Sequence, residues 1–570
     1  MLNIKIEGIP YQVEEGLTIL EAAKACGYEI PSLCSFNHGE CNQGSCRVCL
    51  VEATGARGLI ASCVYPVSEG MEIRIGSPAA VDARRHSVEL LLSNHNKNCQ
   101  QCDKNGKCEL LHVASVTGAR EGRYQGTKTP TTYDELTPTI VRDTSKCILC
   151  GRCIARCQNA HGKDMGILGF ENRGFNTILA PAENRSFINS PCIMCGQCIN
   201  VCPTGALMEK SEIGRVDAAM KAGKYVIVQT APAVRAALGE EFGMKIGTPV
   251  TGKMVAALRR LGFKKVFDTN FAADLTIMEE GTELLGRIQN GGTLPMITSC
   301  SPGWVNYAEY NYGDLLGHLS TCKSPHQMFG AILKTHYAAK IDVDPKDIFV
   351  VSIMPCSCKK YEKEREQMFT NGLADVDAVL TTRELGRLIR RSGINFAKLP
   401  DEDFDNDIVH DYTGAGVIFG VTGGVTEAVL RYANSDKTYS ALREIAQSGV
   451  RGLEGVKEMV YDLGETQLKI AMVSGLGNAE KLIQKIQAGE VEYHLVEVMA
   501  CPNGCVSGGG QPFAHGDEKQ QRADNLYKTD GLTQIKRSEE NPILGEIYAR
   551  YIGSRSHELL HVHYHPKHED

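Results

Sequence analysis

The same pattern of cysteines occurs twice in this chain, at residues 147–157 (CILCGRCIARC) and at residues 192–203 (CIMCGQCINVCP). Each copy spaces four cysteines as C-x2-C-x2-C-x3-C. Proline follows the last cysteine only in the second copy; Gln158 follows it in the first, a difference that touches no ligand. Thiols at this spacing are typical of iron–sulfur cluster ligands, so the internal repeat predicts a unit built around two clusters.

The repeat resembles the two-cluster ferredoxins of bacteria, in which the fourth cysteine of each run binds the cluster of the other run. The resemblance implies two [4Fe-4S] clusters with crossed ligands. One set is Cys147, Cys150, Cys153 and Cys202, and the other is Cys192, Cys195, Cys198 and Cys157. Structural zinc is disfavoured, because two interlocked runs of this kind have no need of it.

Cysteine is concentrated at the front of the chain, where 17 of the 23 cysteines precede residue 203. An intracellular chain keeps such thiols reduced and available to metals. The length of 570 residues predicts about four domains, and 42% hydrophobic residues suffice for real cores. A net charge of −7 argues against nucleic acid as a partner. Because no apolar stretch reaches the roughly 18 residues of a membrane span, we expect no membrane span and a soluble, cytoplasmic protein.

Residues 2–75 predict a small β-rich domain. Leu2, Ile4 and Ile6 alternate with polar residues as in a half-buried strand, and residues 18–25 have a helical pattern. Five thiols then offer ligands for a [2Fe-2S] cluster, so one must be spare: Cys34, Cys41, Cys46, Cys49 and Cys63. The segment from Cys41 to Cys49 matches the plant ferredoxin spacing, and the residues alone leave the spare thiol open.

His95 precedes three cysteines in the pattern H-x3-C-x2-C-x5-C, formed with Cys99, Cys102 and Cys108. A lone histidine is more often a solvated surface residue, and only the three thiols close behind it favour a ligand role. The complete four-ligand set suits either structural zinc or an iron–sulfur cluster. A row of clusters in one chain conducts single electrons between a surface contact and a buried site. The cysteine-rich residues before 203 therefore predict an electron-transfer chain.

From about residue 210 the pattern becomes α/β. Apolar runs at 225–228 and 348–353 predict strands, and amphipathic runs at 253–261 and 382–389 predict helices. The remaining cysteines lie at the ends of predicted strands or in glycine-rich loops, where α/β folds place chemistry. Cys501 and Cys505 run into three glycines at 508–510, which let the backbone approach a cluster and leave room for its ligands. The alternative is a glycine-rich turn with two structural cysteines.

Three distant segments resemble, in order and spacing, the signature motifs of [FeFe]-hydrogenases: residues 298–304 (TSCSPGW), residues 354–362 (MPCSCKKYE) and residues 497–512 (EVMACPNGCVSGGGQP). The front and the C-terminal segment 556–561 (SHELLH) also resemble this family, and the front resembles the large iron–sulfur subunit of respiratory complex I. The resemblance implies a multidomain α+β and α/β fold. Its parts would be a β-grasp [2Fe-2S] ferredoxin domain (1–79), a [4Fe-4S] module with one histidine and three cysteine ligands (80–125), a 2[4Fe-4S] ferredoxin domain (137–209) and a large α/β H-cluster domain (210–570) that includes a small-subunit-like C-terminal segment.

The resemblance also implies which residues hold the front clusters. It selects Cys34, Cys46, Cys49 and Cys63 for the [2Fe-2S] cluster and leaves Cys41 unligated. It favours a [4Fe-4S] cluster over zinc at His95, Cys99, Cys102 and Cys108. The chain would therefore carry one [2Fe-2S] and three accessory [4Fe-4S] clusters.

The implied active site is the H-cluster, a [4Fe-4S] cubane joined through one cysteine to a two-iron unit with carbon monoxide, cyanide and a bridging dithiolate. Cys356, Cys501 and Cys505 would be cubane ligands, with Cys505 as the bridge. Lys359 would hold a cyanide by a charge-assisted hydrogen bond, although most lysines are simply solvated. Pro232, Met354 and Met499 would line the two-iron unit, although methionine is ordinarily a core filler.

Glu280, Glu283 and Arg287 fall on one helical face, at positions i, i+3 and i+7. Charged residues at that spacing most often form a solvated face. The resemblance assigns them, together with Ser320, to the proton path of the family.

The pair Cys300-Ser301 departs from the family, whose best-studied members have two adjacent cysteines, a proton relay followed by a cubane ligand. If the spacing to Cys356 is the same as in the family, with no gap, Cys300 falls at the relay position and Ser301 at the ligand position. Cluster iron favours a thiolate over an alkoxide, however, so we expect Cys300 to bind the cubane and Ser301 to pass protons. Cys322 and Cys358 are the reserves, and His326 stands where some relatives have glutamine.

The predicted function is reversible H2 oxidation and proton reduction, with electrons relayed through the front clusters. Electrons would pass to ferredoxin or to partner subunits that bind flavin and NAD(P), because no G-x-G-x-x-G nucleotide motif appears in this chain. Separate maturation proteins would supply the two-iron unit. The alternative is a non-catalytic electron-transfer subunit or an H2 sensor with the same fold.

Overall fold

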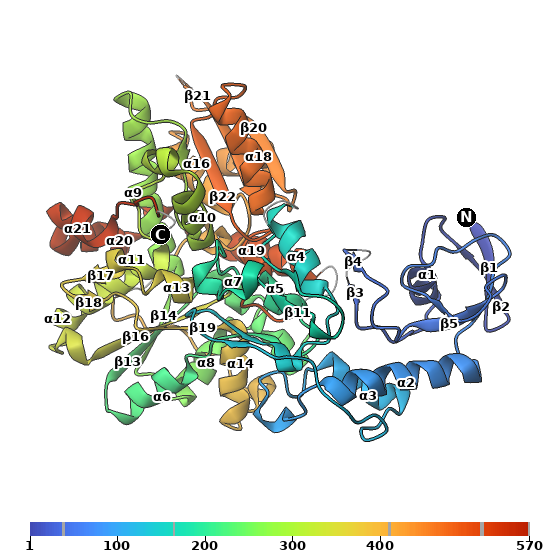
Figure 1. Ribbon diagram of the computed structural model, residues 1–570. Coiled ribbons are helices and arrows are strands. Elements are labelled where there is room, and N and C mark those ends of the chain that lie inside the picture. The colour runs from blue at the N-terminus through green and yellow to red at the C-terminus, as the bar shows by residue number, and fades with distance from the viewer. Residues whose placement is uncertain (37–39, 163–165, 409–411, 465, 514–517, 568–570) are drawn as a thin grey trace. The chain divides into compact units, whose positions relative to one another are not determined.

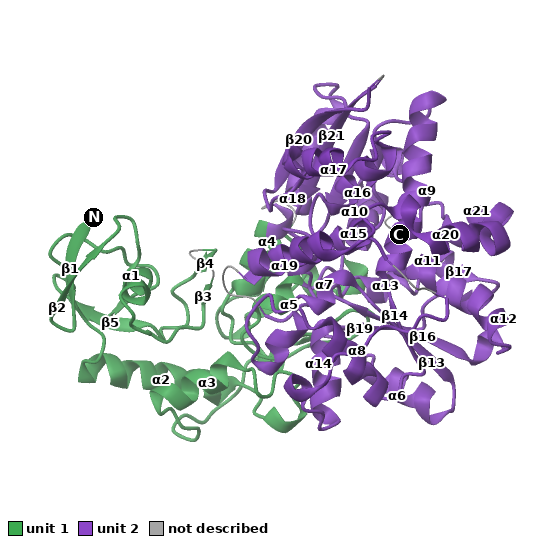
Figure 2. Ribbon diagram, turned by 180° about the vertical axis from the view of Figure 1, so that it is seen from behind, with its two compact units in different colours: residues 1–159, 163–190, 197–208 green, residues 160–162, 191–196, 209–570 purple. Residues whose placement is uncertain are grey.

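The computed structural model describes residues 1–36, 40–162, 166–408, 412–464, 466–513 and 518–567 (Figure 1). The chain divides into two compact units, which Figure 2 colours separately. Unit 1 comprises residues 1–159, 163–190 and 197–208, and unit 2 comprises residues 160–162, 191–196 and 209–570. The division passes through the second cysteine run, so Cys192 and Cys195 belong to unit 2 while Cys198 and Cys202 belong to unit 1.

Unit 1 begins with a five-stranded sheet in the order β2-β1-β7-β5-β6. Its strands are β1 (Leu2–Ile6), β2 (Ile9–Val13), β5 (Leu50–Ala53), β6 (Ile60–Ala61) and β7 (Glu72–Arg74). The predicted alternation is confirmed, because Ile4 and Ile6 point into the core. The predicted helix is also confirmed as α1 (Ile19–Ala25), which starts at a capping box formed by Thr18 and Glu21.

The rest of unit 1 is built from short elements around cysteine loops. Its helices are α2 (Pro78–Asn94), α3 (Glu109–Thr117) and α5 (Gln197–Val201), and α4 (Arg152–His161) begins in it. The predicted boundary after residue 79 falls inside α2, whose N-cap is Ser77. A two-stranded sheet of β3 (Ser35–Phe36) and β4 (Cys41–Asn42) and two further small sheets complete this region. The two further sheets contain β8 (Tyr133–Asp134), β9 (Ile140–Asp143) and β12 (Leu207–Glu209) in one, and β10 (Gly169–Glu171) and β11 (Ile178–Ala180) in the other.

Unit 2 is α/β and contains two four-stranded sheets. The first has the order β14-β13-β16-β19 and is entirely parallel. Its strands are β13 (Tyr225–Thr230), β14 (Lys265–Asp268), β16 (Ile348–Met354) and β19 (Ala378–Thr381). The predicted strands and helices of this region are confirmed, the helices as α8 (Thr251–Arg260) and α14 (Thr382–Arg391).

The second sheet has the order β15-β22-β21-β20, with only β20 antiparallel to its neighbour. Its strands are β15 (Met296–Ile297), β20 (Val456–Asp462), β21 (Gln467–Ser474) and β22 (Leu495–Met499). Long helix α9 (Asn270–Gln289) packs against α11 (Pro325–Ile332), α15 (Gly414–Ile418) and α16 (Gly424–Ala433) (Figure 1).

The motif cysteines of unit 2 follow the carboxyl ends of strands. Cys300 comes after β15, Cys356 after β16 and Cys501 after β22, and Pro232 opens α7 (Pro232–Arg235) directly after β13. Loops at the carboxyl ends of parallel strands are where α/β proteins bind ligands. None of the described helices combines the length and apolar character needed to cross a bilayer.

Candidate functional site

A cavity in unit 2 collects the residues of the three motifs. Cys300, Cys356, Cys501 and Cys505 all line it, and its volume is about 100 Å³. These four side chains are half-buried, in contrast to the fully buried Cys322 and Cys358. Four thiols from three separate loops therefore face one space, where several of them could bind a single metal cluster.

The wall of this cavity is mostly apolar, with one cation. Pro232, Met354 and Met499 line it at the ends of their strands, as does Lys359. Burial raises the pKa of the Cys505 thiol to about 12, with a further contribution from Cys356. A bound cation would offset this effect by stabilising the thiolates. Soft donors, apolar walls and a positive charge suit an anionic iron–sulfur cluster with small anionic ligands.

Lys359 is held by a buried carboxylate. Its Nζ lies 2.9 Å from Glu362 Oε2 and 3.0 Å from Ser324 Oγ. His326 Nε2 lies 2.5 Å from the same Glu362 oxygen, and its Nδ1 lies 3.2 Å from Ser352 Oγ. Burial lowers the pKa of His326 to about 4, so its Nε2–H donates to Glu362 as a neutral imidazole.

The same contacts keep Lys359 charged. Burial opposes its charge, but Glu362 outweighs burial and raises the pKa of Lys359 above its ordinary value. Burial likewise opposes the charge on Glu362, but Lys359 and His326 lower its pKa to about 2. Sequence reasoning assigned no role to Glu362, although its spacing of three from Lys359 was a signal that the two side chains could meet.

The glycine run after Cys505 lets backbone segments approach closely, and Gly508 also lines the cavity. A Cβ on Gly508 would lie 2.3 Å from Pro355 O, and one on Gly509 would lie 2.0 Å from Cys195 O. A Cβ on Gly510 would lie 2.9 Å from the Thr381 side chain. Side chains at these positions would therefore collide with protein, and the expectation that the glycines also make room for cluster ligands stays a prediction.

Cys300 and Ser301 both line the cavity but have different surroundings. After burial, the carboxyl group of Glu280 is the strongest influence that raises the pKa of the Cys300 thiol. Ser301 Oγ accepts a hydrogen bond from Ala500 N at 3.2 Å, next to Cys501 in the chain. Cys358 also lines the cavity, and its thiol donates to Ile193 O at 3.1 Å.

The predicted proton residues lie on α9 and, for Ser320, in the segment before α11; Glu283 connects Arg287 and Ser320, whereas neither carboxyl oxygen of Glu280 has a hydrogen-bond partner among the described residues. Glu280 is buried, and burial together with the neighbouring Glu283 raises its pKa to about 8. Ser320 Oγ donates to Glu283 Oε2 at 3.0 Å, and Arg287 Nη2 donates to Glu283 Oε1 at 2.6 Å. A carboxyl group that changes protonation near neutral pH suits a proton relay.

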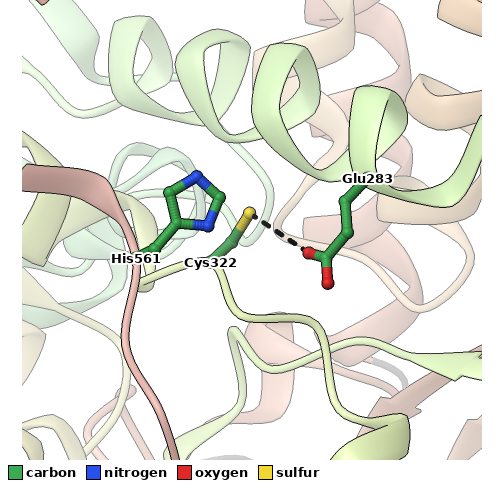
Figure 3. Close-up of side chains that lie close together, drawn as sticks. All are labelled: Glu283, Cys322 and His561. Carbon is green, nitrogen blue, oxygen red and sulfur yellow. Dashed lines mark hydrogen bonds between the residues drawn. The ribbon is translucent and has the colours of Figure 1, made fainter. Parts of the chain in front are cut away.

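The reserve cysteine Cys322 lies in another place, beside Glu283 and His561 (Figure 3). Its Sγ is 4.0 Å from Glu283 Oε2. Ligand atoms of these three residues lie within 4.8 Å of one another, and no other such group of three or more metal-binding side chains occurs in the described part of the chain.

In unit 1, four of the five candidate ligands for the [2Fe-2S] cluster are packed together. Cys34 interacts with Cys46 and Cys63, and Cys49 interacts with Cys63. These contacts lower the pKa of Cys34, and they lower that of Cys49 to about 6. The fifth thiol, Cys41, points elsewhere, with its Sγ 3.9 Å from Cys150 O.

His95 ends α2 and lies next in the chain to the loop that holds Cys99, Cys102 and Cys108. Burial lowers its pKa to about 4, so the imidazole is neutral, and its Nδ1 has no hydrogen-bond partner among the described residues. A neutral ring with an unpartnered nitrogen can act as a ligand.

The internal repeat has a repeated backbone. Leu149 and Met194, two residues after the first cysteine of each run, have positive φ angles of 51° and 59°. Their N–H groups each donate to that cysteine, Cys147 or Cys192, at 3.4 Å. Such N–H donors stabilise thiolate sulfur.

The first crossed ligand set surrounds one cavity. Cys147, Cys150, Cys153 and Cys202 all line it, in unit 1. Of the other set, Cys157 and Cys198 belong to unit 1 and Cys192 and Cys195 to unit 2. Cys157 Sγ accepts from Ile167 N at 3.4 Å, and Cys195 Sγ lies 3.3 Å from His161 Nε2.

Comparison with protein families divides the chain into consecutive regions. A family described as "Iron only hydrogenase large subunit, C-terminal domain" matches residues 224–509, and "Iron hydrogenase small subunit" matches residues 516–567. In the front, a "2Fe-2S iron-sulfur cluster binding domain" matches residues 1–78. An "NADH-ubiquinone oxidoreductase-G iron-sulfur binding region" matches residues 84–123, and a "4Fe-4S dicluster domain" matches residues 139–203.

Individual relatives agree with these regions. The chain is 48% identical to the NADP-reducing hydrogenase subunit HndD of Solidesulfovibrio fructosivorans, over 99% of both chains. It is 42% identical to Iron hydrogenase 1 of Clostridium pasteurianum, over 99% of this chain and 100% of that one. A solved variant of [FeFe]-hydrogenase HydA1 from Chlamydomonas reinhardtii superposes with a TM-score of 0.54 at 39% identity, covering 63% of this chain and 99% of that one.

Proposed function

The chain belongs to the iron-only hydrogenase family, and from this premise we propose that the cavity lined by Cys300, Cys356, Cys501 and Cys505 is its H-cluster site. The protein is an [FeFe]-hydrogenase that interconverts H2 with two protons and two electrons. The observation that carries the site assignment is the convergence of these half-buried thiols on one cavity. When bound, the H-cluster supplies an open iron position for H2 chemistry.

The protein's own residues position this group and exclude water. Cys356, Cys501 and Cys505 would hold the cubane, and we assign to Cys505 the link to the two-iron unit. Lys359, kept charged by Glu362, donates to an anionic cyanide. Pro232, Met354 and Met499 close the apolar wall around the two-iron unit.

The surroundings of Cys300 and Ser301 favour Cys300 as the proton relay and Ser301 as the cubane ligand. This is the order obtained by counting from Cys356 without a gap. Cys300 faces the field of Glu280, so we assign its thiol to proton transfer between that carboxyl group and the cavity. Ser301 Oγ accepts from Ala500 N–H beside Cys501, which supports our assignment of Ser301 to the fourth corner, where it would bind the cubane. An N–H donor stabilises an anionic oxygen there, which partly offsets the preference of cluster iron for sulfur.

Protons then pass from Cys300 to Glu280, Ser320 and Glu283, with Arg287 holding the outer carboxylate. Electrons pass through the front. We assign a [2Fe-2S] cluster to Cys34, Cys46, Cys49 and Cys63, and three [4Fe-4S] clusters to the His95 set and the two crossed sets. The corresponding domains are a β-grasp ferredoxin domain (1–79), a module with one histidine and three cysteine ligands (80–125), a two-cluster ferredoxin domain (137–209) and the H-cluster domain (210–570).

The electron partner is a flavin- and NAD(P)-binding iron–sulfur subunit, with ferredoxin as the second candidate. The 48% identity to a subunit named NADP-reducing hydrogenase supports the first. Maturation proteins deliver the two-iron unit, and the reduced cysteines favour a cytoplasmic location. Purification from native cells tests the partner: co-purifying flavoprotein subunits are expected, whereas a monomer fully active with ferredoxin alone would contradict the complex.

H2 evolution by the matured protein, with a chemically reduced viologen as electron donor, tests the site. Cys505→Ala is expected to abolish it. The matched control is Cys26→Ala, which removes a half-buried thiol at the end of α1, outside every proposed ligand set.

A further inference from the structure

Glu283, Cys322 and His561 come from three distant segments and bring a carboxylate, a thiol and an imidazole to one point. Glu283 projects from α9, Cys322 from the loop before α11, and His561 from the end of α21 (Ser556–Leu560) (Figure 3). One ligand atom from each lies within 4.8 Å of the other two. Oxygen, sulfur and nitrogen donors at this spacing suit a single tetrahedral Zn2+ ion.

The backbone around these residues is fixed by strand-like pairing. Cys322 and His561 face each other in an antiparallel bridge. Val562 N donates to Thr321 O at 2.7 Å, and Lys323 N donates to Leu560 O at 2.8 Å. The two ligands are therefore held together before any ion binds.

His561 is oriented as metal-binding histidines are. Its Nε2 lies 3.0 Å from Glu279 Oε2, and a carboxylate can only accept, so Nε2 carries the proton. The lone pair is then on Nδ1, which lies 2.8 Å from Thr321 Oγ1 on the side of Cys322. A carboxylate behind a histidine fixes the ring and strengthens it as a ligand.

Glu283 can bind an ion without losing its arginine. Arg287 donates to Oε1 at 2.6 Å, whereas Oε2 accepts from Ser320 Oγ at 3.0 Å and from Thr321 N and Oγ1 at 3.1 and 3.3 Å, and lies 4.0 Å from Cys322 Sγ. A zinc ion on Oε2, with the thiolate of Cys322, would be neutralised by its own ligands. It would also replace the Ser320 hydrogen bond.

We propose that Glu283, Cys322 and His561 form an inhibitory site for Zn2+, with Glu279 as the orienting partner of His561. This rests on the proposed function, because inhibition follows only if Glu283 relays protons. An ion on Glu283 Oε2 separates this carboxylate from Ser320 and so interrupts the path to Glu280. Exposed His557, whose ring centroid lies 4.6 Å from that of His561, offers an entry point for the ion.

The experiment uses the matured protein with all its clusters, dialysed against chelator and then titrated with ZnCl2. Zinc retained after desalting and the zinc X-ray absorption spectrum report binding, and viologen-driven H2 evolution reports inhibition. We expect the parent protein to retain one additional zinc ion per chain compared with Cys322→Ala, and this ion should have a sulfur neighbour at about 2.3 Å. Glu279→Gln, which keeps all three ligands, is expected to weaken binding roughly 10–100-fold. His557→Ala is the control for surface histidines and should retain the zinc.

The outcomes separate the site from the proton path. Equal zinc binding in the parent and in Cys322→Ala would overturn the site, as would the lack of a sulfur neighbour, and an active enzyme would leave the hydrogenase assignment standing. Zinc bound as expected but without effect on H2 evolution would uphold the site and overturn the relay role of Glu283. Chelator-reversible inhibition that Cys322→Ala abolishes would support both.

Discussion

Lys359 and Glu362 form a buried ion pair at the wall of the active-site cavity, with Nζ 2.9 Å from Oε2. The same oxygen accepts from His326 Nε2 at 2.5 Å. An unpaired cation at a buried position is costly, because burial disfavours the charged form of lysine. Glu362 therefore lets Lys359 remain charged where it lines the cavity, and His326 fixes Glu362.

Replacing Glu362 tests this support. In Glu362→Gln the pKa of Lys359 should fall, because burial is no longer offset by a carboxylate. We expect loss of most H2 evolution, together with changed cyanide bands in the infrared spectrum of the matured protein. Unchanged cyanide bands would show that Lys359 does not depend on Glu362.

His326 offers a matched pair of variants. His326→Gln keeps an N–H donor for Glu362, whereas His326→Leu removes it and leaves a buried carboxylate with one partner fewer. We expect His326→Gln to keep most activity and His326→Leu to lose at least about tenfold, the effect of roughly 1.4 kcal/mol. Equal activities would show that the histidine is only a packing residue.

Glu280→Gln should slow turnover by roughly 10²–10⁴-fold, the usual contribution of a positioned acid or base. It should also change how stability depends on pH. The folded protein holds a proton on Glu280 up to about pH 8, whereas the unfolded chain releases it near 4.5. The parent protein therefore loses stability as pH rises through this window, and the glutamine variant lacks this loss.

The measurement is the unfolding temperature of both proteins at about pH 5 and about pH 8. The raised pKa of Glu280 costs the parent protein little stability at the lower pH and much more at the higher pH. The variant's stability relative to the parent should increase with pH. A constant difference would contradict a raised pKa for Glu280.

Cys300 and Ser301 can be separated by their effects on the cubane. We expect Cys300→Ala to assemble its clusters and lose H2 evolution, and Ser301→Cys to keep the cubane and remain active. Electron paramagnetic resonance of protein expressed without maturation proteins reports the cubane. Loss of its signal in Cys300→Ala would instead make Cys300 the fourth ligand.

Cys34 and Cys41 can also be separated by their effects on a cluster, here the [2Fe-2S] cluster of the N-terminal domain. Cys34 interacts with two of the other thiols, whereas Cys41 Sγ lies 3.9 Å from Cys150 O. Cys34→Ser should lose or strongly shift the [2Fe-2S] signal, and Cys41→Ser should keep it. Loss of the signal in Cys41→Ser and its retention in Cys34→Ser would instead show that Cys41 is the ligand, as in the plant ferredoxin spacing.

Local spacing allowed much of the site to be predicted. Ligands of one cluster that are three residues apart, such as Cys147 and Cys150, are brought together by a single loop. Cys300 and Cys501 were predictable for another reason, because they follow β15 and β22, parallel neighbours whose carboxyl ends place their loops at one edge of the sheet.

Contacts between distant segments could not be predicted in this way. The approach of His326 to Glu362 depends on how α11 packs beside α13 (Lys359–Glu362), which no local pattern specifies. The group of Glu283, Cys322 and His561 likewise depends on the C-terminal segment pairing with the loop at Cys322. The glycines after Cys505 were predictable as a close approach, but the sequence did not show that their neighbour is protein backbone.

Infrared spectroscopy of the matured protein, with H2 evolution measured on the same sample, is the most direct test of the active site. Carbon monoxide and cyanide stretching bands should appear together with activity, and both should be missing from Cys505→Ala and from protein made without maturation proteins. H2 evolution without these bands, or bands that persist unchanged in Cys505→Ala, would contradict an H-cluster in the cavity at Cys356, Cys501 and Cys505.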